Sequence, residues 1–187
     1  MNQLHILQQR VSVSKLQSPA PDKQVLHEVF KAAIRAADHG MLRPWRFLVI
    51  EGDGLHALSQ VFVSAAIKGN PGISPSVVEK CKNMPSRAPM IIVAIAKCQS
   101  HPKIPREEQV IACGAAVQNM LNAFFALDFG AIWRTGEMAR DLYVNQALGL
   151  IDGEEIIGFI YVGTPTQPFA SPPAVDATTF FKAWPHE

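Results

Sequence analysis

Two uninterrupted apolar runs, Met90–Ala96 and Ile156–Gly163, constrain the fold of this chain more than any other feature of its sequence. Both are far shorter than the roughly 18 residues that a helix needs to cross a bilayer. A continuous apolar run of strand length is typical of a strand buried in the interior of a sheet. The runs therefore predict interior strands and no membrane span.

Helical and strand patterns alternate along the rest of the chain. Asp22 is a suitable N-cap for a helix that continues to about Ala36. The pattern over 107–127 is apolar nearly all round, which indicates a helix central to the core or buried in an oligomer interface. The alternation predicts an α+β or α/β fold, with a sheet flanked by helices. Further helices are expected before Arg10, over 55–68, up to Met84 and over 139–148, and strands over 46–51, 88–96, 130–134 and 155–163.

Length and charge limit the classes of function. A chain of 187 residues suits one domain, 1–187, with a core at about 4–165 and an extended arm at about 165–187. Seventeen Lys and Arg residues against sixteen Asp and Glu residues give a net charge of +1, which disfavours a nucleic-acid partner. The N-terminus has no apolar stretch typical of a signal peptide, so we expect a cytoplasmic protein.

Several well-known chemical motifs do not occur in the sequence. There is no Gly-x-Gly-x-x-Gly, no P-loop, no Gly-x-Ser-x-Gly and no cluster of histidines or carboxylates with metal-ligand spacing. Cys81, Cys98 and Cys113 never form a Cys-x-x-Cys pair, so buried free thiols are expected. The sequence therefore predicts no metal site and no side-chain nucleophile.

Arginines stand beside small polar or aromatic residues at several places: Arg10 near Ser12, Arg35 near His39, and Trp133 before Arg134. Each arginine alone is better explained as a solvated charge or a helix-end charge. Together they indicate an anion site with an aromatic floor, since guanidinium and hydroxyl groups bind phosphate and apolar walls bind a planar ring. FMN fits this description.

Five segments extend this interpretation to a family. In this order along the chain, they resemble motifs of the short, YdjA-like branch of the FMN-dependent NAD(P)H nitroreductase family. The resemblance implies an α+β fold with a central mixed β-sheet flanked by helices, and a homodimer whose two subunits both contact FMN. The segments are Arg10-Val-Ser-Val-Ser-Lys15, residues 36–47, Gly114-Ala-Ala-Val-Gln-Asn-Met-Leu121, Gly130-Ala-Ile-Trp-Arg134 and Ile157–Gly163.

The resemblance also implies roles for individual residues. Arg10, Val11 and Ser12 match the segment that holds the flavin phosphate and ribityl chain. Val11 stands where the family has a second arginine, and Lys15 is expected to replace part of the missing donor. Residues 36–45 depart from the commoner family pattern, so ring contacts must be made differently there.

The remaining site residues lie on three segments. Arg35 and His39 match FMN contacts and would lie one turn apart if their helix continues. Residues 131–133 match the segment that passes against the flavin of the second subunit. The segment over 121–126 matches a nicotinamide-nucleotide contact, although its apolar residues are equally explained as core. The last two segments comprise Leu121, Asn122, Ala123, Phe124, Phe125 and Ala126, and Ala131, Ile132 and Trp133 with the adjacent Arg134.

The resemblance implies an FMN-dependent NAD(P)H oxidoreductase that reduces nitroaromatic, quinone or similar small electron-poor acceptors by ping-pong hydride transfer. The flavin carries the chemistry, so no catalytic side chain is expected. Two alternatives remain open at this stage. The protein could be an FMN carrier with little turnover, which Val11 and the altered 36–45 segment motivate, or an interaction protein that no longer binds FMN.

Overall fold

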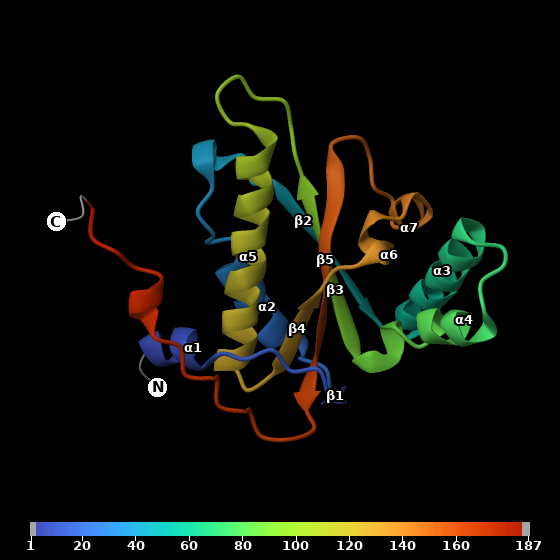
Figure 1. Cartoon of the computed structure of the whole chain (residues 1–187), viewed down its shortest axis with the longest axis horizontal. Helices are drawn as coiled ribbons and strands as arrows, with labels where there is room; N and C mark the ends of the chain where they lie inside the picture. Colours follow the sequence, from blue (N-terminus) through green and yellow to red (C-terminus); the bar gives the residue numbers. More distant parts are fainter. Residues whose placement is uncertain (1–2, 185–187) are drawn as a thin grey trace.

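One antiparallel sheet organises the computed structural model, which describes residues 3–184 (Figure 1). Its strand order is β1-β5-β3-β2, and β4 also pairs with β5. The expected mixed sheet is thus antiparallel within one chain, because β5 runs antiparallel to all three of its partner strands. The strands are β1 (Leu16–Gln17), β2 (Trp45–Glu51), β3 (Met90–Lys97), β4 (Gly130–Arg134) and β5 (Glu154–Pro165).

The interior strand β3 separates two hydrophobic clusters. Every residue from Met90 to Ala96 has an exposed fraction of 0%. Because successive side chains of a strand point to opposite faces, Ile91 and Val93 enter one cluster and Ile92 and Ala94 enter the other. The apolar run therefore forms a strand covered on both faces, as the sequence predicts.

Helices cover both faces of the sheet. Helices α2 and α5 lie over one face, and α3, α6 and α7 lie over the other (Figure 1). Within the part of the chain that the structure describes, no helix is long and apolar enough to cross a membrane. The helices are α1 (Gln3–Gln9), α2 (Lys23–Ala33), α3 (Asp53–Gly69), α4 (Pro75–Lys82), α5 (Arg106–Ala126), α6 (Glu137–Arg140) and α7 (Leu142–Ala147), with short 3-10 turns η1 (His39–Met41), η2 (Pro85–Arg87) and η3 (Ala177–Thr179).

Two helix boundaries differ from the sequence prediction. The cap of α2 is confirmed, since Asp22 accepts a hydrogen bond from the Val25 amide at 2.8 Å. However, α2 ends at Ala33 and not near Ala36, because the Arg35 and Ala36 amides bond only three residues back and tighten the chain into a turn. The helix expected over 139–148 is interrupted at Asp141, whose extended backbone and side chain cap α7.

The C-terminal segment leaves the sheet after β5 and extends past the carboxyl end of α5 (Figure 1). Phe169 packs against Phe125 of α5, with ring centroids 4.7 Å apart. Beyond this contact Phe180 and Phe181 have exposed fractions of 73% and 78%. The described part of the expected arm is therefore extended with one short turn, and residues 185–187 lie outside the described residues.

A largely buried ion pair ties the edge strand β2 to the start of β5. The Arg46 guanidinium donates to both carboxylate oxygens of Glu154, at 2.7 and 2.6 Å, and to the Gly149 carbonyl at 3.0 Å. The Glu154 side chain has an exposed fraction of 3%. The hydrogen bond from Arg46 is the main cause that holds the pKa of Glu154 below its ordinary value.

We predict that Glu154→Gln lowers the free energy of unfolding at neutral pH by about 2 to 3 kcal/mol, because Arg46 loses a charge-assisted partner. The pKa of Glu154 is lower in the folded state than in the unfolded state. Its stabilisation is therefore full above the ordinary Glu value of 4.5 and is lost as pH falls through the folded-state pKa. Urea unfolding over a pH series measures both effects.

The matched control is Glu155→Gln, because the neighbouring Glu155 forms a more exposed pair with Arg106 at 2.9 Å. This control should change the free energy of unfolding by at most about 1 kcal/mol. Equal effects of the two variants, or an unchanged acid dependence in Glu154→Gln, would contradict the role given to Glu154.

Candidate functional site

The N-terminal segment 10–15 lies beside β4. The Val13 amide donates to the Ala131 carbonyl at 3.0 Å. A Cβ at Gly130 would lie 2.6 Å from Leu16 and 3.1 Å from Val13, so only glycine permits this close approach. Arg10 is half-buried. The structure thus brings together the two segments to which the resemblance assigns the flavin phosphate and part of its ring.

Trp133 is fixed in place on β4. Its indole N–H donates to the Ile157 carbonyl at 3.0 Å, and the ring passes 3.7 Å from the Cβ position of Gly114 on α5. A Cβ at Gly158 would overlap the indole. Gly158 therefore leaves the space that the Trp133 ring fills, while Gly114 lies in ordinary contact with it.

The next residue along β4, Arg134, lines a cavity of about 520 Å³. This size lies within the range of small-molecule and cofactor sites. Three cations line the cavity, and none of them forms an ion pair among residues 3–184. Glu137 is a carboxylate in its wall. The cations are Lys80, Arg87 and Arg134, and the aromatic lining residues are Phe62, Phe159 and Tyr161.

The Tyr161 hydroxyl belongs to this cationic and aromatic cavity. Burial raises the pKa of Tyr161, while the charges of Arg87 and Arg134 oppose the rise. The phenol is therefore protonated at neutral pH and able to donate a hydrogen bond. The Arg134 guanidinium carbon lies 5.8 Å from the Tyr161 ring centroid. The arrangement suits a planar ligand that carries partial negative charge at one edge.

Sequence reasoning missed three residues of this cavity: Lys80, Arg87 and Tyr161. Arg87 directly precedes the apolar run of β3, and Tyr161 is the polar member of the run in β5. A charged or hydroxyl-bearing residue beside or within a buried apolar strand indicates a possible site residue.

His39 lies near the amino end of α5, whereas Arg35 follows Ala32, whose carbonyl accepts from Asn119 in the middle of the helix at 3.2 Å. The His39 Nδ1 is 2.7 Å from the Glu108 carboxylate, near the first residue of α5. Because α2 ends at Ala33, the expected placing of Arg35 and His39 one helical turn apart is wrong. Eighteen residues of α5 separate Glu108 from the carboxyl end, which is about 27 Å at 1.5 Å per residue. One chain therefore does not bring His39 to the segment 10–15.

The segment 121–126 forms the last turns of α5. Leu121 and Phe124 have exposed fractions of 6% and 0% and pack in the core. Asn122 and Phe125 are half-buried, and Phe125 contacts the Phe169 ring. Contact with a nicotinamide nucleotide stays a prediction for this segment, and its two core side chains are turned away from the surface.

The three cysteines are free thiols. Cys81 and Cys113 are buried, as expected, and Cys98 is half-buried. Burial raises the pKa of Cys113 to about 12, so this thiol is protonated at neutral pH and is a poor nucleophile.

Comparison with known proteins identifies the family of the chain. Residues 7–164 match the nitroreductase family. The chain is 41% identical over 165 residues to "Putative NAD(P)H nitroreductase YdjA" of Escherichia coli (strain K12), which covers 88% of this chain and 89% of the relative.

Solved structures share the fold. A nitroreductase-like family protein from Bacillus cereus superposes with a TM-score of 0.84 at 19% identity, over 100% of this chain and 97% of that chain. A "putative nitroreductase in complex with fmn" from Desulfovibrio desulfuricans gives a TM-score of 0.76 at 22% identity, over 100% and 99%. The α+β nitroreductase-like fold expected from the sequence is confirmed.

We predict that Gly158→Ala displaces the Trp133 indole, because the added methyl group would occupy the position of the ring. The expected results are a shifted indole N–H resonance in ¹H–¹⁵N NMR spectra and a loss of about 1 to 3 kcal/mol of unfolding free energy, as for other overpacked cores. Gly114→Ala is the control, since its added Cβ would make only an ordinary contact with the same ring. If the control shifted the Trp133 signal as much as Gly158→Ala, the packing argument would fail.

Proposed function

We propose that this chain, which belongs to the nitroreductase family of oxidoreductases, uses FMN to pass electrons from NAD(P)H to nitroaromatic, quinone or similar electron-poor acceptors. The observation that carries the proposal is the placing of the cationic segment 10–15 next to β4, where the Val13 amide donates to the Ala131 carbonyl at 3.0 Å.

The donors of the segment 10–15 fit the phosphate and ribityl chain of FMN. Arg10 forms no ion pair among the described residues, so its guanidinium is available to a phosphate. Ser12 and Lys15 are exposed beside it and add hydroxyl and ammonium donors. Val11 supplies no donor in place of the family's second arginine. Charge-assisted hydrogen bonds of this kind are the strong ones in phosphate recognition.

The side chains near β4 would bind and orient the ring end. When bound, FMN supplies a hydride acceptor that is reduced by NAD(P)H and then reoxidised by the acceptor substrate. Arg87 and Arg134 would stabilise negative charge at the edge of the ring, and the Tyr161 hydroxyl would donate a hydrogen bond there. Trp133 points to the opposite face of β4 from Arg134, packs with the cluster that includes α5, and does not line this cavity.

The size of the cavity supports ping-pong turnover. With a flavin bound beside β4, a cavity of about 520 Å³ leaves little room for nicotinamide and acceptor together. The two substrates would therefore use the same space in turn, which gives ping-pong kinetics. The preference between NADH and NADPH would depend on residues outside this cavity.

We also propose that the active form is a homodimer. His39 bonds to Glu108 near the start of α5, about 27 Å along the helix from its carboxyl end, so we assign His39 to a site that a second chain completes. A second copy with its α5 antiparallel to the first would place His39 of one chain near Arg10 of the other. The exposed Phe180 and Phe181 of the C-terminal segment have the apolar surface expected of an arm that packs on a partner.

The first functional prediction concerns the cofactor. The purified protein should carry noncovalent FMN, and anaerobic NADPH or NADH should bleach the flavin absorbance before any acceptor is added. Menadione should then restore the absorbance in a separate step. A flavin that neither nucleotide bleaches would favour the carrier hypothesis, and release of FAD on denaturation would contradict the choice of FMN.

Arg10→Ala should raise the dissociation constant of FMN tenfold or more, because it removes a charge-assisted contact worth about 1.5 to 3 kcal/mol. Titration of the apoprotein by flavin fluorescence measures the change. The control is Lys23→Ala, an exposed cation at the start of α2 that should leave the affinity unchanged. Equal affinities of wild type and Arg10→Ala would remove Arg10 from the phosphate site.

A complementation experiment tests whether one FMN site is formed by two chains. Arg10→Ala and His39→Ala homodimers should each bind FMN weakly. A mixed dimer has one site that lacks both side chains and one intact site. Mixing the two variants should therefore restore tight binding at one site per mixed dimer, as measured by FMN titration of the isolated mixed species. If both residues served the same chain's site, no mixed dimer would contain an intact site and binding would not recover.

A further inference from the structure

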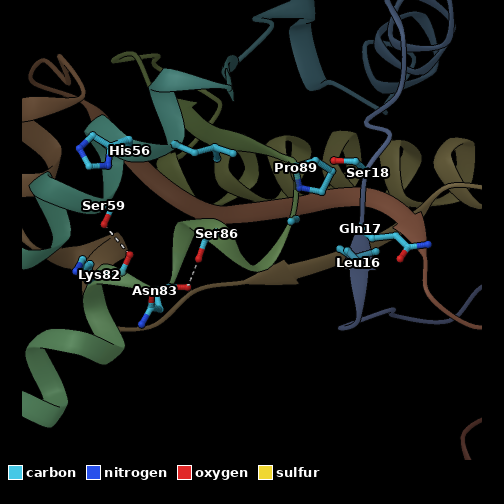
Figure 2. A pocket seen from close by; sticks show the side chains of 11 residues that line it. Leu16, Gln17, Ser18, His56, Ser59, Lys82, Asn83, Ser86 and Pro89 are labelled. Atoms are coloured by element: carbon cyan, nitrogen blue, oxygen red, sulfur yellow. Dashed lines mark hydrogen bonds between the residues drawn. The ribbon is translucent and has the colours of Figure 1, made fainter.

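A second cavity of about 520 Å³ lies across the 80–88 segment from the one beside β4. The two cavities share none of their lining residues, because Lys80 and Arg87 face the first while Lys82 and Ser86 face the second. Helix α3 and the short strand β1 complete its wall, with Ser18 and Pro89 seen on one side and His56 and Ser59 on the other (Figure 2).

The lining of this cavity carries one formal positive charge, on Lys82, and no carboxylate. The nearest acidic partner is Glu79, 3.7 Å from the Lys82 ammonium and outside the lining, in a pair whose two side chains are each 60% exposed. An exposed pair of this kind is weak, so Lys82 keeps donors for a ligand. The cavity therefore favours an anion.

The carboxyl end of α4 limits how much negative charge the ligand can carry. Carbonyl groups at a helix C-terminus repel anions. Here two hydroxyls offset this effect: Ser59 donates to the Lys82 carbonyl at 2.6 Å and Ser86 donates to the Asn83 carbonyl at 3.1 Å (Figure 2). No arginine lines the cavity, and the first turn of α3 contributes Leu55 and His56 to its wall. A dianionic phosphate therefore lacks the bidentate guanidinium donor it usually has.

The rest of the wall is apolar. Leu16 and Leu55 contribute aliphatic surface from β1 and α3, and Ala88 and Pro89 contribute it from the segment before β3. An apolar wall of this extent suits a hydrocarbon body next to the charged group. We propose that the second cavity binds a small carboxylic acid with a hydrocarbon or aromatic body, whose carboxylate contacts Lys82. This site is separate from the flavin site and does not depend on the proposed function.

The test uses benzoate as the probe and the full purified chain with the flavin it retains. In ¹H–¹⁵N NMR spectra, benzoate should shift the amide signals of Ser18 and Ser86. Calorimetric titration should show that Lys82→Gln weakens benzoate binding at least fivefold. Benzyl alcohol, which has a similar body without the charge, should bind more weakly than benzoate and with the same affinity to both proteins.

Two further variants distinguish binding in this cavity from a general effect of surface charge. Lys23→Gln removes an equal charge from an exposed residue outside the cavity lining and should leave benzoate binding unchanged. Ser86→Leu should block binding by extending into the cavity, and its urea midpoint checks that the fold is retained. Flavin absorbance of the same samples reports the FMN site separately. Equal effects of Lys82→Gln and Lys23→Gln, or benzoate-induced shifts confined to residues around Arg134, would overturn the proposal.

Discussion

The burial of β3 on both faces is the constraint on which the rest of the structure depends. A strand without polar side chains from Met90 to Ala96 needs helices over both faces of its sheet, and α5 and α3 belong to the two layers that meet this need. Packing of α5 on one face fixes where the chain returns as β4. The position of β4 in turn fixes the approach of the N-terminal segment through Val13. The candidate site is thus a consequence of how the central strand is covered.

The sequence predicts the parts of the fold that depend on local pattern. Hydrophobic periodicity and apolar runs lie within single segments and so identify β2, β3, β5 and α5. The cap at Asp22 is a similar local signal. Residues 10–15 and 131–134 also meet as the resemblance implies. Their close approach uses the space that Gly130 leaves beside Leu16 and Val13. The need for glycine at this position is visible only in the folded structure.

Features that depend on contacts between distant segments could not be predicted in this way. Helix propensity predicts poorly whether a residue continues a helix or starts a turn. The sequence therefore does not show that α2 ends at Ala33 or that the later helix is interrupted at Asp141. The strand β1 comprises two residues and exists only because β5 offers a free edge there. Lys80 and Arg87 become cavity residues only when α4 and η2 fold against β4 and β5. No spacing in the sequence shows that they would face Arg134.

The length of α5 links cofactor binding to assembly. A helix of 21 residues is too rigid to bring its two ends together, so in our proposal Arg10 and His39 serve one FMN from different chains. In the proposed dimer, FMN would contact both subunits and would bind neither separated chain as well. A ligand that binds only the associated form stabilises that form by mass action. Loss of FMN should therefore weaken the dimer, and dilution of the dimer should release FMN. FMN binding and dimerisation are thermodynamically coupled because both use the same interface.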